Sequence, residues 1–194
     1  MDIPRLESIQ IIEAIESALK QVDSDGKNLT PQKLHRSRSK LWVKHFALEL
    51  KRQYHDENIV AFYRDKSSRE ILFDISIGYN DEFDTNKTKV PINYIKIPLW
   101  QIESEFVLNA SKVAFDFTKL IVGSAPFKMM IGSISTQKRD SEYFMNAVKE
   151  IAKYIEAKEL YYLLLSHPNS WNNVKEIEFS LYKWSSVKWR EEKK

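Results

Sequence analysis

The chain has 194 residues, of which 43% are hydrophobic and 12% aromatic, and its net charge is only +3. This composition argues against a disordered chain and predicts one globular α/β or α+β domain spanning residues 1–194. Cysteine is absent and the four histidines are scattered, which excludes thiolate sites and disfavours zinc, so oxygen ligands remain for any metal. Because no apolar run reaches the roughly 20 residues that cross a bilayer and the N-terminus is not signal-like, we expect a cytoplasmic protein without membrane contact.

Two amphipathic helices are expected in the first third of the chain, over residues 4–22 and 39–54, where apolar residues recur at helical spacing. Basic residues precede the second helix and continue along it. Three of them fall within about 40° of one another on a helical wheel and form a lysine row. Such a row is usually a solvated face, but with the basic run before it this segment is the candidate for phosphate contacts with DNA. The candidate residues are Lys33, Arg36, Arg38, and the row itself, Lys40, Lys44 and Lys51.

Residues 58–63 and 70–79 are rich in β-branched and aromatic residues and are expected to form an antiparallel pair joined by a charged turn. Asp74 interrupts the apolar run of the second strand, and an acid among apolar strand residues is a candidate functional residue. Residues 80–89 are polar and predict an excursion from the sheet. Pro91 and Pro98 argue against a regular central strand between them.

Glu103 and Glu105 lie two residues apart in an apolar strand, so their side chains point to the same face. Two neighbouring carboxylates repel each other, which is costly unless a cation, a partner base or water lies between them. The pair therefore indicates a site for a divalent metal or for acid/base chemistry. The alternative is a half-exposed edge strand with two solvated glutamates.

The remaining pattern predicts alternating helices and strands. Helices are expected over residues 109–122, ending at Gly123, and over 139–158. Strands are expected over 127–131, 159–165 and 176–182, the last at the sheet edge because it alternates apolar and polar residues. Residues 185–194 are expected to be a frayed tail.

Four short segments resemble, in their order along the chain, the core of the PD-(D/E)XK nuclease superfamily: FDIS, IESEF, DFTKL and APFKMMI. The resemblance implies a restriction-endonuclease-like α/β fold, with a mixed central sheet flanked by helices. It also implies that Asp74 and Glu103 hold Mg²⁺ or Mn²⁺. Glu105 stands where the family usually has lysine, a variant found in some restriction endonucleases, and Phe73 stands where proline commonly precedes the first acid. Lys119, or Lys112, on the following helix could supply the missing positive charge, although either could instead form an ordinary i,i+4 ion pair.

The expected function is therefore metal-dependent hydrolysis of DNA phosphodiester bonds, with Asp74, Glu103, Glu105 and Lys119 as the catalytic residues. Cutting both strands would favour a homodimer. The alternatives are a non-catalytic module on the same fold that binds nucleic acid or a protein, and a small immunity or adaptor protein with an acidic surface. Metal affinity at Asp74 and Glu103 separates the enzyme from the non-catalytic module.

Overall fold

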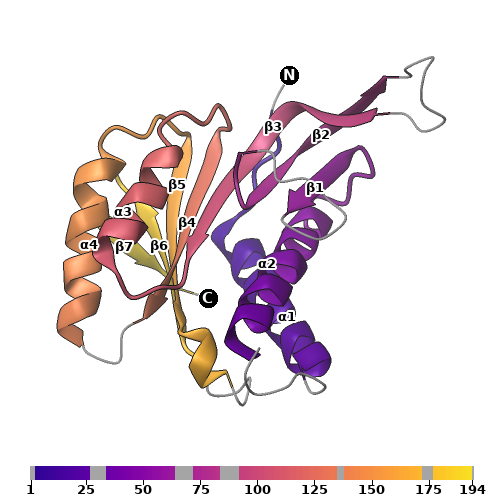
Figure 1. The fold of residues 1–194 in the computed structure, drawn as a ribbon. Helices are drawn as coiled ribbons and strands as arrows, with labels where there is room; N and C mark the ends of the chain where they lie inside the picture. Colours follow the sequence, from indigo (N-terminus) through magenta and orange to yellow (C-terminus); the bar gives the residue numbers. More distant parts are fainter. Residues whose placement is uncertain are drawn as a thin grey trace.

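Seven strands form one mixed sheet in the computed structural model, which describes residues 3–26, 34–63, 72–83, 92–134, 138–171 and 177–193 (Figure 1). The strands lie side by side in chain order: β1 (Ile59–Tyr63), β2 (Ile75–Phe83), β3 (Ile92–Glu105), β4 (Phe127–Ile134), β5 (Glu159–Ser166), β6 (Phe179–Trp184) and β7 (Trp189–Glu192). The three central strands, β3 to β5, are parallel, and the pairs on both sides are antiparallel. The expected α/β architecture with a mixed central sheet is confirmed.

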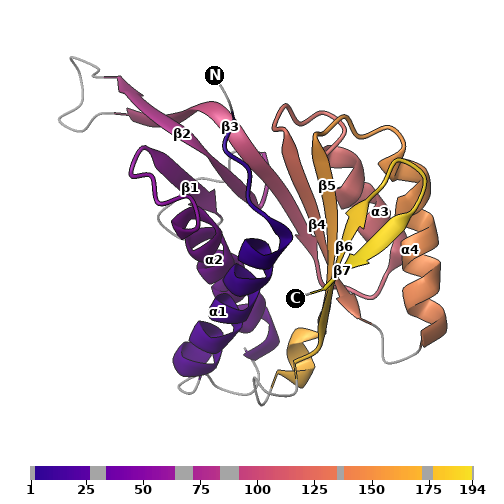
Figure 2. The ribbon, with the colours of Figure 1, turned by 180° about the vertical axis from the view of Figure 1, so that it is seen from behind.

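Two pairs of helices cover the two faces of the sheet (Figures 1 and 2). Helices α1 (Ser8–Gly26) and α2 (Leu34–Arg52) pack on one face, and α3 (Ala110–Lys119) and α4 (Lys138–Ala152) on the other. Side chains of β3 alternate between these faces: Ile102 is buried in the core beneath α1 and α2, whereas Glu103 faces Lys119 of α3. None of the described helices is long and apolar enough to span a membrane.

Strand β3 continues through Pro98, which contradicts the expectation that prolines would prevent a regular central strand here. Pro98 pairs with Gly78 of β2, where the register between the two strands shifts. Such an irregularity tolerates a residue that cannot donate to the ladder. Gly78 is required at this point, because a Cβ atom there would lie 2.3 Å from the carbonyl oxygen of Ile97.

The C-terminal segment is more ordered than expected. Residues 189–192, predicted as part of a frayed tail, form β7 and pair with β6, so β6 is not the edge strand. Aromatic packing explains the difference: the ring of Trp189 lies 5.0 Å from that of Trp184 and 6.4 Å from that of Phe117 on α3. Helix α2 also begins at Leu34, earlier than expected, and β2 extends to Phe83 into the predicted polar excursion.

A fully buried lysine closes the C-terminal end of α3. Lys128, on β4, donates hydrogen bonds from Nζ to the carbonyl oxygens of Leu120, at 2.8 Å, and Gly123, at 2.7 Å. These carbonyls lie just beyond the last turn of the helix, where the regular helical hydrogen bonds end, and Leu120 also accepts a hydrogen bond of 3.4 Å from the N–H of Gly123. Lys128 therefore stabilises the junction between α3 and β4, the strand that pairs with β3.

We expect Lys128→Met to lower the free energy of unfolding by about 2–5 kcal/mol, because it removes both hydrogen bonds that Lys128 donates to the carbonyl groups of this junction. Lys153→Met is the matched control, since Lys153 is exposed on the turn after α4 and pairs with the exposed Glu150, and it should change stability by less than about 0.5 kcal/mol. Urea denaturation of both variants measures the difference. Equal stability of the two variants would show that Lys128 does not hold this junction.

Candidate functional site

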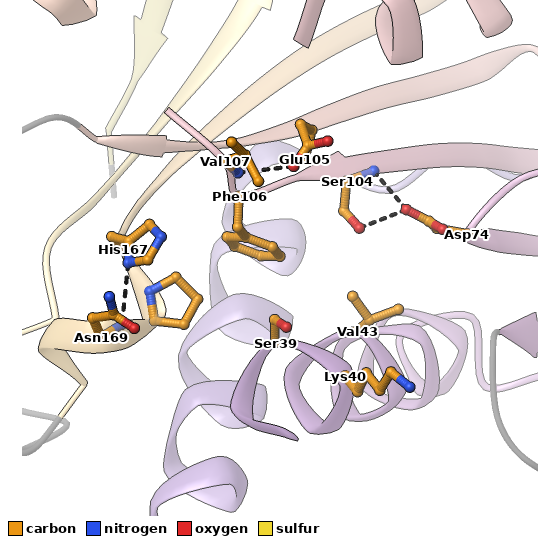
Figure 3. A pocket seen from close by; sticks show the side chains of 11 residues that line it. Ser39, Lys40, Val43, Asp74, Ser104, Glu105, Phe106, Val107, His167 and Asn169 are labelled. Carbon is orange, nitrogen blue, oxygen red and sulfur yellow. Dashed lines mark hydrogen bonds between the residues drawn. The ribbon is translucent and has the colours of Figure 1, made fainter. Parts of the chain in front are cut away.

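Asp74 and Glu103 lie next to each other where β2 begins and β3 ends. Ile75, the first residue of β2, pairs with Ile102 of β3. Asp74, which directly precedes β2, therefore lies opposite Glu103. The Oδ2 atom of Asp74 accepts hydrogen bonds from the backbone N–H of Ser104, at 2.9 Å, and from its hydroxyl, at 2.6 Å (Figure 3). The carboxylate thus extends the contact between the two strands beyond the last backbone pair.

Glu103 is buried, with 2% of its surface exposed, and forms an ion pair with Lys119 of α3 at 3.1 Å. Burial, and then the negative charge of Asp74, raise the pKa of Glu103 to about 8, although Lys119 opposes this rise. Burial would lower the pKa of Lys119, but its hydrogen bonds to Asp116 and Glu103 outweigh that effect and raise it. Lys119 thus pairs with two acids, Glu103 and its neighbour on α3, Asp116, the latter at 2.7 Å.

Glu105 ends β3 and lies at the surface of the same region. Its Oε1 atom accepts a hydrogen bond from the backbone N–H of Val107 at 2.8 Å. Burial raises the pKa of this carboxyl, as does the charge of Asp116, while the Val107 hydrogen bond lowers it. Its side chain is directed away from α2, as expected from the alternation with Ser104 and Phe106, which point toward that helix (Figure 3).

A cavity of about 510 Å³ opens beside these residues, between the end of β3, the first half of α2 and the 3₁₀ turn η2 (Pro168–Ser170) that follows β5. Figure 3 shows its lining side chains. The polar ones are Asp74, Ser104 and Glu105 from the β2–β3 side, Ser39 and Lys40 from α2, and His167 and Asn169 from the turn. Glu103 and Lys119 do not line this cavity: they lie on the side of β3 that faces α3.

The structure separates the basic residues that the sequence groups together. Lys40 lines the cavity, and Lys44 lies one turn further along α2. Lys51 is eleven residues beyond Lys40, about 16 Å along the helix, and borders a different hollow. Arg38 donates from Nη1 to the carbonyl oxygen of Pro168 at 3.4 Å, which joins α2 to the turn after β5. Lys33 and the side chain of Arg36 lie outside the described residues.

His167, like Ser39 and Asn169, lines this cavity but was not identified in the sequence analysis. It follows β5 directly, and β5 is one of the three parallel strands. The carboxyl ends of neighbouring parallel strands meet at one edge of a sheet, where ligands bind in many α/β proteins. A polar residue that ends a buried strand was therefore the available signal, but placing it beside Asp74 requires the strand order.

The described residues contain no group of three or more histidine, cysteine, aspartate or glutamate side chains arranged to hold a metal ion. A magnesium ion does not require such a group, because it usually keeps several waters and binds one or two carboxylates together with substrate phosphates. Asp74 and Glu103 provide two hard oxygen donors whose mutual repulsion a cation would relieve. This donor set suits Mg²⁺ or Mn²⁺ and does not suit a soft metal.

Comparisons with known proteins do not assign a family. No protein-family model matches the chain, and no curated protein matches it. One solved structure, the central domain of yeast acetyl-CoA carboxylase, is similar at 8% identity and a TM-score of 0.39, with 94% of this chain and 33% of that chain covered. The chain thus spans about a third of that structure's length, and a likeness of this degree carries no functional argument.

Proposed function

We propose that this protein is a metal-dependent nuclease that hydrolyses DNA phosphodiester bonds. The observation that carries the proposal is the meeting of Asp74 and Glu103 at adjacent strand ends, with Lys119 reaching Glu103 from the next helix. The order of elements supports it, since β2 with its acid, β3 with two glutamates, α3 and β4 follow one another as the resemblance to PD-(D/E)XK nucleases implies. A cytoplasmic location and a homodimer that cuts both strands belong to the same proposal.

Each residue has a distinct task in this proposal. Asp74 and Glu103 would hold a Mg²⁺ or Mn²⁺ ion, which neutralises charge on the phosphate and makes bound water acidic. Ser104 fixes the orientation of Asp74 through two hydrogen bonds. Glu105, at the cavity surface, would orient the attacking water. Lys119 takes the role of the lysine that usually occupies the position of Glu105 in the family.

Calorimetric titration with MnCl₂ tests the first step without requiring a DNA substrate. The parent protein should bind Mn²⁺, and Asp74→Asn should weaken binding by at least about tenfold, because the amide keeps the shape of the side chain but removes one negative charge. Asp81→Asn is the matched control: Asp81 lies further along β2 and pairs with Lys96. Absence of Mn²⁺ binding to the folded parent protein would refute the proposal.

A non-catalytic module that binds nucleic acid or a protein is the second candidate, and one observation favours it. Both acids already have protein partners, since Asp74 accepts two hydrogen bonds from Ser104 and Glu103 pairs with Lys119. In such a module these contacts would only stabilise the end of β3. If the protein is such a module, the parent protein should bind Mn²⁺ no more tightly than the Asp74→Asn variant does, and it should not cleave DNA.

A further inference from the structure

Lys119 lies between two carboxylates of different exposure. Its Nζ atom is 3.1 Å from Oε2 of Glu103, whose side chain is 2% exposed, and 2.7 Å from Oδ1 of Asp116, whose side chain is 17% exposed. The nuclease proposed above gives tasks to Glu103 and Lys119 but none to Asp116. Because Asp116 and Lys119 are three residues apart on α3, an ordinary helical ion pair is the alternative role for Asp116.

The backbone that carries Lys119 is fixed by the packing of α3. Val113 and Phe117 are buried on the inner face of this helix, and Lys119 is its last residue. Directly after it, the carbonyl oxygen of Leu120 accepts a hydrogen bond from the buried Lys128. The ammonium group of Lys119 can therefore change partner by rotation of its own flexible side chain, without movement of the helix.

Asp116 also faces the open side of the site. It lines a hollow of about 350 Å³ between the end of β3 and α3, together with Glu105 and Lys112. Glu103, in contrast, is buried. Lys119 thus joins a buried carboxylate to one at the surface of the site.

A metal ion at Glu103 would change the balance between the two contacts of Lys119. The ammonium group and the ion are both positive, so they repel each other when they share one carboxylate. If Glu103 were the sole acceptor, the ion would separate Lys119 from its partner in a partly buried place, which is costly. Asp116 provides a second acceptor, at the shorter of the two distances.

We infer that Asp116 is a positioning residue of the site, which receives the ammonium group of Lys119 when a metal ion binds to Glu103. The inference rests on the proposed function, because it requires the metal. Asp116 lowers the cost of separating Lys119 from Glu103 and keeps the positive charge beside the site, where the proposed nuclease uses it. Unlike an ordinary ion pair, Asp116 then affects metal binding through Lys119.

A double-mutant cycle on Mn²⁺ affinity, measured by calorimetric titration without DNA, tests the inference. Asp116→Asn should weaken Mn²⁺ binding by about tenfold in the parent protein, near the lower end of what a hydrogen bond to a charged group contributes. Lys119→Gln should bind Mn²⁺ more tightly than the parent, since its neutral amide does not compete with the ion. In the Lys119→Gln background, Asp116→Asn should weaken binding by about threefold or less, through the lost charge alone.

Two further variants complete the comparison, with circular dichroism to confirm folding. Asp116→Glu keeps the charge without changing Lys119, and it should bind Mn²⁺ more tightly than Asp116→Asn does. Glu150→Gln is the matched control and should bind like the parent. Glu150 and Lys153 form an ion pair of the same spacing, also at 2.7 Å, at the end of α4 that leads to β5.

Equal fold losses from Asp116→Asn in the two backgrounds would overturn the inference, because Asp116 would then act on the ion by its charge alone. Parent-like Mn²⁺ binding by Asp116→Asn, or weaker binding by Lys119→Gln than by the parent, would overturn it as well. These outcomes leave the nuclease proposal standing, since the parent protein still binds Mn²⁺. Absence of Mn²⁺ binding by the parent protein would refute the nuclease proposal, and the inference with it.

Discussion

Asp74→Asn and Glu103→Gln should each reduce cleavage of DNA in the presence of Mg²⁺ or Mn²⁺ by at least about 100-fold. Each substitution keeps the size and hydrogen-bonding capacity of the side chain but removes one of the two charges that hold the metal. In Asp74→Asn, Ser104 can still donate its hydroxyl to the oxygen of the new side-chain amide, so the strand ends should stay together. The loss should therefore appear in the rate and not in the fold.

Conversion of supercoiled plasmid to nicked and linear forms measures this loss, with circular dichroism to confirm folding. Glu13→Gln is the matched control, because Glu13 is exposed on α1, remote from the end of β3. It should cleave at the parent rate. Cleavage at the parent rate by Asp74→Asn would refute the assignment of this residue to the metal, even if the protein proves to be a nuclease.

Glu105→Lys extends the same experiment to the third position of the motif. Lysine is the common residue there in PD-(D/E)XK nucleases, so a site that uses this position for catalysis should keep some activity or change its preference between Mg²⁺ and Mn²⁺. Lys119 would then be the second lysine near the acids, and Lys119→Met in the Glu105→Lys background should be tolerated better than Lys119→Met alone. Equal losses in the two backgrounds would show that Lys119 does not substitute for the missing lysine.

The proximity of Asp74 and Glu103 follows from features that the sequence carries. The apolar strands, the alternation of side chains and the order of the four segments place both acids at neighbouring strand ends. The hydrogen bonds from Ser104 to Asp74 were not predictable, because they depend on a local change of chain direction: Leu72, two residues earlier, has a positive φ of 78°. The pattern of apolar and polar residues does not predict the φ angle of a single residue such as Leu72.

Contacts between distant segments account for most of the remaining differences. His167 enters the cavity only because β5 lies beside β4, and Trp189 is held by Trp184 on the neighbouring strand and by Phe117 on α3. For the lysine row of α2, the helix was predicted from the sequence, but the distance between its ends separates its members. Its helical spacing is found in the structure, but a straight helix carries Lys51 about 16 Å from Lys40, too far to share one cavity.

The burial of Glu103 should make the stability of the protein depend on pH in an unusual direction. Its pKa is raised to about 8 in the folded protein, whereas an exposed glutamate in the unfolded chain has a pKa of about 4.3. Between these values the folded protein holds a proton that the unfolded chain has lost. The free energy of unfolding should therefore fall as pH rises through this window, by up to about 1.4 kcal/mol per pH unit from this group.

Glu103→Gln isolates this contribution, because glutamine stays neutral at every pH. Parent and variant should have similar stability near pH 4.5, and the variant should become the more stable of the two as pH approaches 8, with no further divergence above that value. Urea denaturation at intervals of one pH unit measures the difference, and equal pH dependence in both proteins would contradict it.

Metal binding should depend on pH in the opposite sense. Since Glu103 must release its proton to hold a cation, Mn²⁺ affinity should rise with pH up to about 8 and level off above it.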